Sequence, residues 1–192
     1  MNKEQKIIVV TGASSGIGLG LCEKLIEKDE FLIYGIDIES STPLLGLKGY
    51  NHITCDLRDF NNTFDSIQQS GLLKESIFSL VNAAGIMPSM LVSSLEPNMA
   101  SDTFTVNCVA PLYLTKLMLK GLARSKGSTV INLTSIAADI DIPGETVYSS
   151  SKSALKHITK SMAIELSRFK IKVNSIAPAL VETNMTCHLS SK

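Results

Sequence analysis

Hydrophobic and polar positions along the chain form two kinds of segment. Short apolar runs, typical of buried strands, occupy residues 6–11, 31–37, 50–55, 77–82, 129–135 and 171–177. Longer segments with apolar residues at helical spacing occupy residues 17–28, 60–69, 99–124 and 147–169. This alternation predicts an α/β fold with a doubly wound parallel sheet of about six strands, covered by helices on both faces in three α/β/α layers.

Length and composition favour one domain that acts on a small molecule. The 192 residues fit a single domain spanning residues 1–192, and the 44% of apolar residues can form one core. Basic and acidic residues number 18 each, so no basic excess favours nucleic acid. No apolar run reaches membrane-spanning length or resembles a signal peptide, so we expect a soluble cytoplasmic protein without a membrane partner.

A glycine-rich turn, Thr-Gly-Ala-Ser-Ser-Gly-Ile-Gly at residues 11–18, joins the first expected strand to the first expected helix. Glycines at such a place let the backbone approach a pyrophosphate, whose charge is stabilised by the helix amino terminus. The alternative is a tight turn that binds nothing. The residues expected to contact a dinucleotide here are Gly12, Ser14, Ser15, Gly16, Ile17 and Gly18.

Asp37 ends the second expected strand, about 20 residues after Gly18. Its carboxylate could accept hydrogen bonds from the adenosine ribose hydroxyls, and it would repel a 2′-phosphate. No lysine or arginine stands at residues 13–15 or 38–39 to offset that repulsion. NAD is therefore the expected cofactor in preference to NADP, unless Asp37 only caps a turn.

Tyr148 and Lys152 are four positions apart in an expected helix, so their side chains share one face. An ammonium group beside a phenol favours phenolate, and this would lower the pKa of the tyrosine toward the range of a useful acid or base. Such a group can exchange a proton with a hydroxyl while a cofactor exchanges hydride. Ser135 could hydrogen-bond the substrate oxygen, although serines also cap strands and tyrosines also pack at helix starts.

Together these motifs resemble the short-chain dehydrogenase/reductase family, in order along nearly the whole chain. Asn-Ala-Ala-Gly at residues 82–85 is similar to the family's Asn-Ala-Gly segment, and Pro-Ala-Leu-Val-Glu-Thr at residues 178–183 is similar to the segment that closes over the nicotinamide. Ala179 departs from the family, which usually has glycine there. The resemblance implies a Rossmann-like fold in which the family's last strand is missing from this sequence.

The resemblance also implies a catalytic tetrad of Asn107, Ser135, Tyr148 and Lys152. In it Tyr148 exchanges the proton, Lys152 lowers its pKa and holds the nicotinamide ribose, and Ser135 binds the substrate oxygen. Asn107 would hold a water that connects Lys152 to solvent. The other cofactor contacts that it implies are Asp56, Leu57, Asn82, Ala83, Ala84, Gly85, Pro178, Val181 and Thr183. Asp56 could equally cap the next helix.

The expected function is hydride transfer between NAD and a hydrophobic secondary alcohol or ketone. Apolar residues border the family's substrate cleft at Met87, Ile136, Ile142, Leu180 and Met185. The alternative is a dinucleotide-binding sensor or assembly subunit without turnover, because family members normally continue through a further helix and strand.

Two further expectations concern association and the cysteines. Apolar residues of the expected long helix, Leu112, Leu117 and Leu119, extend beyond one stripe and indicate self-association. The family implies a homodimer. The cysteines, Cys22, Cys55, Cys108 and Cys187, have neither metal-binding nor disulfide spacing, so we expect reduced, mostly buried thiols and no metal.

Overall fold

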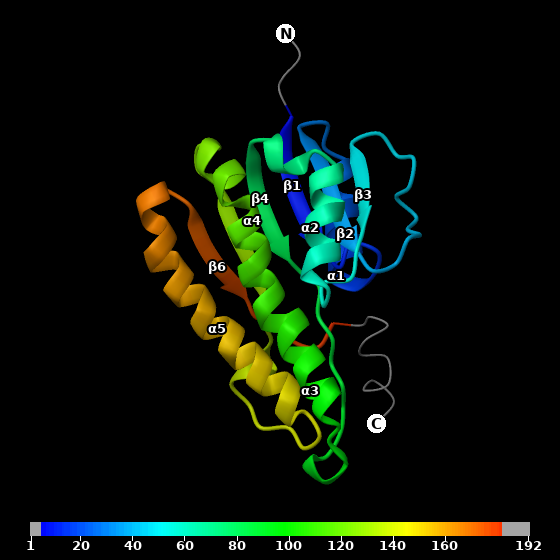
Figure 1. Cartoon of the computed structure of the whole chain (residues 1–192), viewed down its shortest axis with the longest axis vertical. Helices are drawn as coiled ribbons and strands as arrows, with labels where there is room; N and C mark the ends of the chain where they lie inside the picture. The colour runs from blue at the N-terminus through cyan, green and yellow to red at the C-terminus, as the bar shows by residue number, and fades with distance from the viewer. Residues whose placement is uncertain (1–4, 182–192) are drawn as a thin grey trace.

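The computed structural model describes residues 5–181, in which six strands form one parallel sheet in the order β3-β2-β1-β4-β5-β6 (Figure 1). The strands are β1 (Lys6–Thr11), β2 (Phe31–Asp37), β3 (Tyr50–Thr54), β4 (Ile77–Asn82), β5 (Thr129–Leu133) and β6 (Lys172–Ile176). Every strand expected from the sequence is present, and small differences occur only at the ends of β3, β5 and β6.

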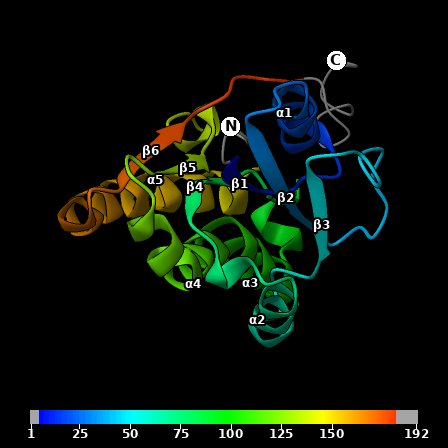
Figure 2. The ribbon, with the colours of Figure 1, turned by 90° about the horizontal axis from the view of Figure 1, so that it is seen from above.

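The helices lie on both faces of this sheet. They are α1 (Gly16–Ile26), α2 (Phe60–Gln69), α3 (Pro97–Phe104), α4 (Ala110–Arg124) and α5 (Thr146–Leu166), with short 3-10 helices at Leu72–Lys74, Val92–Ser94, Ile136–Ala138 and Ser167–Phe169. Figure 2 shows α1 on one face and α2, α4 and α5 on the other. The strand order reverses direction after β3, so right-handed crossovers fall on opposite faces. The predicted doubly wound, Rossmann-like arrangement is confirmed.

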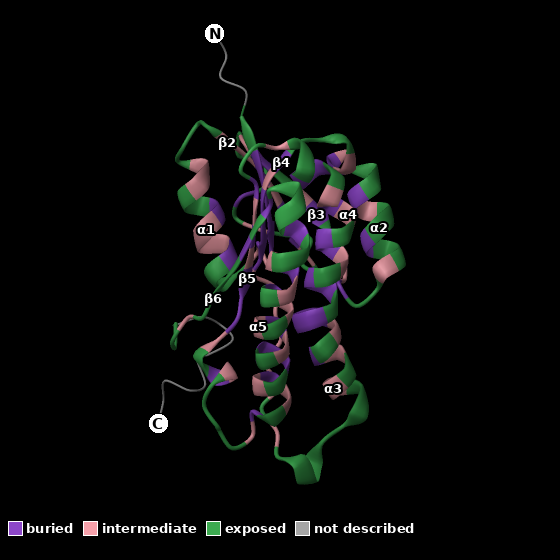
Figure 3. Ribbon diagram, turned by 90° about the vertical axis from the view of Figure 1, so that its left-hand side faces the viewer, coloured by how far each residue is buried: buried purple, intermediate pink, exposed green. Residues whose placement is uncertain are grey.

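Burial on both faces explains why the strands are continuously apolar. Along β1, Ile7 and Val9 join the core formed with α2, α4 and α5, whereas Ile8 and Val10 join the core formed with α1. Buried positions accordingly follow the strands between the two helical layers (Figure 3). No helix in residues 5–181 combines the length and apolarity needed to cross a bilayer.

The expected single helix over residues 99–124 is wrong in one respect, because a π-helical turn at Thr105–Val109 separates α3 from α4. Pro111 lacks the N–H that would bond the Asn107 carbonyl in an α-helix. The turn is wider here, and the Ala110 N–H donates to the Thr105 carbonyl, five residues back. The sequence signal for this interruption is Pro111, which the apolar periodicity alone does not reveal.

The glycine turn brings α1 very close to the end of β1. Gly12 has a positive φ of 68°, and a Cβ atom on it would lie 2.9 Å from the Ala84 backbone. A Cβ atom on Gly18 would lie only 2.1 Å from the Gly12 carbonyl oxygen. Since neither position has room for a side chain, the turn exposes backbone at the carboxyl end of the sheet.

We expect Gly18→Ala to destabilise the protein by about 1–3 kcal/mol, because the added methyl group meets backbone that cannot move aside. Gly20→Ala is a matched control in the same helix, where a Cβ atom meets nothing within 4 Å. It should stabilise the helix by about 0.5–1 kcal/mol. Urea unfolding of both variants measures the difference, and equal effects would contradict the close packing described here.

Candidate active site

A cavity of about 750 Å³ lies at the carboxyl ends of the strands, where the strand order reverses between β1 and β4. The predicted cofactor and catalytic residues that line it are Gly12, Ser15, Gly16, Ile17, Gly18, Asp37, Asp56, Leu57, Ala83, Ala84, Gly85, Ser135, Tyr148, Lys152, Pro178 and Val181. The predicted substrate-cleft residues Met87, Ile136, Ile142 and Leu180 line it as well. Thr183 and Met185 lie outside the described residues.

Three predicted residues, Ser14, Asn82 and Asn107, do not line the cavity and instead support it. The Asn82 side chain donates to Asn132 at 2.8 Å, and Asn132 donates to Thr159 of α5 at 2.8 Å. This buried chain of side chains ties β4 and β5 to α5.

The glycine turn is braced from two sides. Asp37 accepts a hydrogen bond from the Ser14 N–H at 2.9 Å through one carboxylate oxygen and from the Glu39 N–H at 3.0 Å through the other. Asp37 thus does cap a turn, while its carboxylate also lines the cavity. On the opposite side, the Thr11 hydroxyl oxygen accepts from the N–H groups of Ala83 and Ala84, at 3.1 and 3.0 Å.

The sequence analysis missed Thr11, although a buried threonine at the end of an apolar strand is a visible signal. Its two hydrogen bonds join the ends of β1 and β4, the two strands that flank the cavity. Gly12 also packs closely against the Ala84 backbone. The glycine turn after β1 and the segment after β4 are therefore fixed relative to each other.

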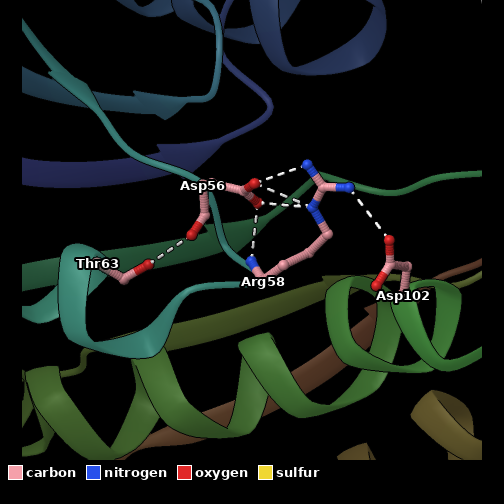
Figure 4. A network of polar contacts seen from close by, with 4 residues as sticks. All are labelled: Asp56, Arg58, Thr63 and Asp102. Carbon is pink, nitrogen blue, oxygen red and sulfur yellow. Dashed lines mark hydrogen bonds and ion pairs between the residues drawn. The ribbon is translucent and has the colours of Figure 1, made fainter. Parts of the chain in front are cut away.

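A second missed residue, Arg58, lines the cavity beside Asp56 (Figure 4). Its guanidinium donates to both carboxylate oxygens of Asp56, at 2.7 to 3.0 Å, and to Asp102 of α3 at 3.1 Å. These hydrogen bonds hold the pKa of the Asp56 carboxyl below its usual value. Asp56 does not cap α2, so that alternative is wrong: Asp59 accepts from the N–H groups of Asn61 and Asn62.

Tyr148 and Lys152 stand on the first turns of α5 and are both buried, with exposed fractions of 9% and 5%. The Lys152 ammonium donates to the Leu133 carbonyl at 2.8 Å and lies 5.7 Å from the centre of the Tyr148 ring. Ser135 follows β5, and its oxygen accepts from the Ala137 N–H at 3.1 Å. With its acceptor side occupied in this way, the Ser135 hydroxyl can donate toward the Tyr148 phenol.

Asn107 is fully buried on the π turn. Its side-chain oxygen accepts from the Ile86 N–H at 2.9 Å, and its side-chain nitrogen donates to the Ile86 carbonyl at 3.0 Å and to the Ser151 hydroxyl at 2.9 Å. With its side chain engaged in this way, the predicted water relay would rest on its main-chain carbonyl, for which Pro111 supplies no N–H. Ser151, the third missed residue, gave no sequence signal.

The electrostatics correct one expectation. Burial lowers the pKa of Lys152 to about 8. Burial also raises the pKa of Tyr148, and the charge of Glu145 raises it further. A hydrogen bond from Ser135 lowers it, but this offsets the increase only in part. The predicted lowering of the Tyr148 pKa is therefore not found, because desolvation of the phenolate is the largest effect. At neutral pH the phenol is uncharged and can act as an acid.

Other chemistry has little support within the described residues. Cys22, Cys55 and Cys108 are free and buried. Burial raises the pKa of the Cys108 thiol, which donates to the Ser151 carbonyl, so Cys108 is not an activated nucleophile. No three His, Cys, Asp or Glu side chains gather there in a metal-binding group. Cys187 lies outside residues 5–181.

The fold, with Ser135, Tyr148 and Lys152 in the same cavity as the glycine turn, defines a nucleotide-dependent oxidoreductase of the Rossmann type. The chain belongs to the short chain dehydrogenase family, whose model matches residues 6–192. Members of this family act on CH–OH or carbonyl groups with NAD(P), and the family resemblance inferred from the motifs is confirmed.

Individual relatives agree with this assignment. The chain is 31% identical to the 3-oxoacyl-[acyl-carrier-protein] reductase FabG of Vibrio harveyi, over 97% of this chain and 78% of the relative. It superimposes on 4-hydroxyisoleucine dehydrogenase complexed with NADH with a TM-score of 0.90 and 32% identity, covering 98% of this chain and 79% of that one. The NADP complex of Pseudomonas aeruginosa RhlG gives a TM-score of 0.88 and 26% identity, covering 98% and 78%.

The lowered pKa of Lys152 predicts a pH-dependent stability. The folded state binds the Lys152 proton with a pKa of about 8 and the unfolded state with one near 10.5, so the unfolded state holds more protons between these values. The free energy of unfolding should therefore rise as pH increases from 8 to 10.5. Below pH 8 the destabilisation caused by burying the Lys152 ammonium should be constant. The size of the change is roughly 3 kcal/mol.

Between pH 8 and 10.5, we expect the free energy of unfolding of the unmodified protein to rise by roughly 3 kcal/mol relative to that of Lys152→Met. Urea unfolding at a series of pH values measures it. Lys160→Met, at an exposed position of the same helix, is the control and should show no such change. A difference independent of pH would refute the burial of a titrating ammonium.

Proposed function

We propose that this protein interconverts a secondary alcohol and a ketone, with Tyr148 exchanging the proton and NAD preferred to NADP. The observation that carries the proposal is the buried cluster of Tyr148, Lys152 and Ser135 at one end of a cavity whose other end is bounded by the glycine turn and Asp37. The cofactor supplies or accepts the hydride when it is bound.

The residues present fit a dinucleotide. At the turn, Gly12 and Gly18 leave no side chain between the backbone and the cavity, and the amino terminus of α1 favours a pyrophosphate there. Asp37 lines the cavity where ribose hydroxyls would need an acceptor, and Lys152 can donate to the ribose nearer the reaction. These contacts would orient the cofactor along the carboxyl ends of the strands.

The proton chemistry follows from the state of Tyr148. An uncharged phenol donates its proton to the carbonyl oxygen of a ketone as hydride arrives at carbon, and takes a proton from the alcohol in the reverse direction. Ser135, oriented by the Ala137 N–H, donates a hydrogen bond to the same oxygen. Met87, Ile136, Ile142 and Leu180 give the cavity an apolar lining, which supports an apolar substrate.

The preference for NAD is supported by the absence of an available cation. Among the described residues that line the cavity, the cations are Arg58 and Lys152. Lys152 is at the catalytic end, and the Arg58 guanidinium is occupied by Asp56 and Asp102. A 2′-phosphate would therefore meet the Asp37 carboxylate without a partner.

Association and location remain expectations. Leu117 and Leu119 pack partly against the core, whereas Leu112 of α4 and Ile164 of α5 are 40% and 78% exposed. These exposed apolar side chains on α4 and α5 support a homodimer. Buried, unpaired thiols in the described region support a cytoplasmic location.

The catalytic assignment predicts that Tyr148→Phe keeps the ring but removes the exchangeable proton. Turnover of a panel of secondary alcohols and ketones should fall by about 10²–10⁴-fold, while NADH affinity measured by fluorescence stays unchanged. Tyr113→Phe, on α4, is the control and should retain activity. If Tyr148→Phe kept its activity as Tyr113→Phe does, the proposed role of Tyr148 would be wrong. A protein that binds NADH and turns over none of the panel would favour the non-catalytic alternative.

The cofactor assignment predicts tighter binding of NADH than of NADPH in calorimetry. Asp37→Asn removes the charge and should reduce the preference by roughly tenfold, because it removes one like-charge repulsion. Asp65→Asn, the same change at an exposed position of α2, should leave it unaltered. Equal affinities for the two cofactors in the unmodified protein would sink the NAD assignment.

A further inference from the structure

Glu145 is an acidic residue that the catalytic chemistry does not use. It stands immediately before α5, three positions before Tyr148, and lines the same cavity. Only 6% of it is exposed. A carboxylate buried to this extent normally has a hydrogen-bonding or ionic partner.

Within the described residues no hydrogen bond or ion pair engages the Glu145 carboxylate, and its oxygens are not among the fully buried unpaired atoms, so they remain accessible from the cavity. Glu145 gives no side-chain cap to α5, and its backbone accounts for its hydrogen bonds, with its N–H donating to the Ile142 carbonyl and its carbonyl accepting from the Ser149 N–H. The two cations that line the cavity are engaged elsewhere, Lys152 with the Leu133 carbonyl and Arg58 with two aspartates. The fold itself therefore gives no reason for an acid at this position.

The Glu145 carboxylate lies close enough to Tyr148 for its charge to affect that side chain. Its charge contributes to the raised pKa of Tyr148, so the two side chains lie within electrostatic range of each other. The neighbouring cavity residues Ile136, Ile142 and Leu180 are apolar. An opposite charge that displaces water between these apolar side chains and the carboxylate gains more than it would in bulk water.

We propose that Glu145 determines specificity by pairing with an ammonium group of the substrate, which makes the substrate an apolar amino alcohol or amino ketone. This inference rests on the proposed alcohol and ketone chemistry and narrows its substrate class. An ammonium group is favoured over a hydroxyl because a neutral donor leaves the negative charge uncompensated. With Tyr148 three positions away, the ammonium lies within a few bonds of the reacting carbon, and the apolar walls take the rest of the molecule.

Three matched alcohols test this inference. In 1-amino-2-heptanol, heptane-1,2-diol and 3-octanol, the carbon next to the carbinol bears an ammonium, a hydroxyl or a methyl group, and the rest is the same. The unmodified protein should oxidise the amino alcohol with a kcat/KM at least about tenfold above that of the other two, as expected for a hydrogen bond to a charged group. Equal values, or a preference for the diol, would overturn the proposal.

Variants then assign the preference to Glu145. Glu145→Gln should abolish the preference for the amino alcohol, measured as the ratio of its kcat/KM to that of 3-octanol. This ratio cancels any effect of the lost charge on the Tyr148 pKa, because Tyr148 serves both substrates. Glu165→Gln, an exposed position of α5, is the matched control and should behave as the unmodified protein. A preference that survives Glu145→Gln would contradict the pairing. The substrate comparison on the unmodified protein does not depend on whether the variant folds.

A binding measurement separates this inference from the proposed function. Calorimetry with the NADH-bound protein compares 1-amino-2-heptanol with 3-octanol. If neither alcohol is oxidised but the amino alcohol binds more tightly in a Glu145-dependent manner, the pairing stands and the catalytic proposal fails. If both are oxidised and bind equally, the catalytic proposal stands and the pairing fails.

Discussion

The buried ammonium group of Lys152 imposes a constraint on everything around it. A charge that is only 5% exposed is costly unless nearby groups compensate it, and here the Leu133 carbonyl at the end of β5 accepts its hydrogen bond. A Cβ atom on Gly85 would lie 3.4 Å from the ammonium and 3.2 Å from the Asn107 side-chain oxygen, so the segment after β4 packs closely against both groups. The end of β5, the segment after β4 and the start of α5 are therefore positioned around one group.

Polar atoms without partners collect around the same cavity. In the described part of the chain, four buried side-chain oxygens have no hydrogen-bond partner, and three of them, in Ser14, Asn82 and Ser149, belong to segments next to the cavity. The fourth, in Ser128, precedes β5 at the opposite end of the sheet. A core evolved only for stability would pair or remove such groups, because each costs free energy when buried. Their concentration at one place is what a site that stabilises a polar ligand would show.

Local patterns predicted the strands, the glycine turn and the catalytic spacing, because each depends on residues close together in the sequence. β1 could be delimited from its β-branched run and the following glycine, and Tyr148 and Lys152 share a helical face by spacing alone. Arg58 was missed because its partner Asp102 is distant in the sequence. The burial of Glu145 and the direction of the Tyr148 pKa were missed for a related reason, since desolvation is a property of the folded surroundings.

Residues 83–87 form a wall between the two ends of the cavity, and hydrogen bonds hold this wall from both sides. On the β1 side, Thr11 accepts from the N–H groups of Ala83 and Ala84. On the helical side, Asn107 pairs with both the N–H and the carbonyl of Ile86, and it can do so because the π turn before Pro111 interrupts the helix.

That helical side also reaches the end of the cavity that is lined by Asp56 and Arg58. α3 leads directly into the π turn, and its Asp102 binds Arg58, which in turn binds Asp56 after β3 (Figure 4). A continuous set of contacts thus runs from Asp56 through α3 and the π turn to Ile86. Because every link is a hydrogen bond, an ion pair or a helical turn, the fold itself sets the spacing between the proposed cofactor contacts and the proposed catalytic side chains.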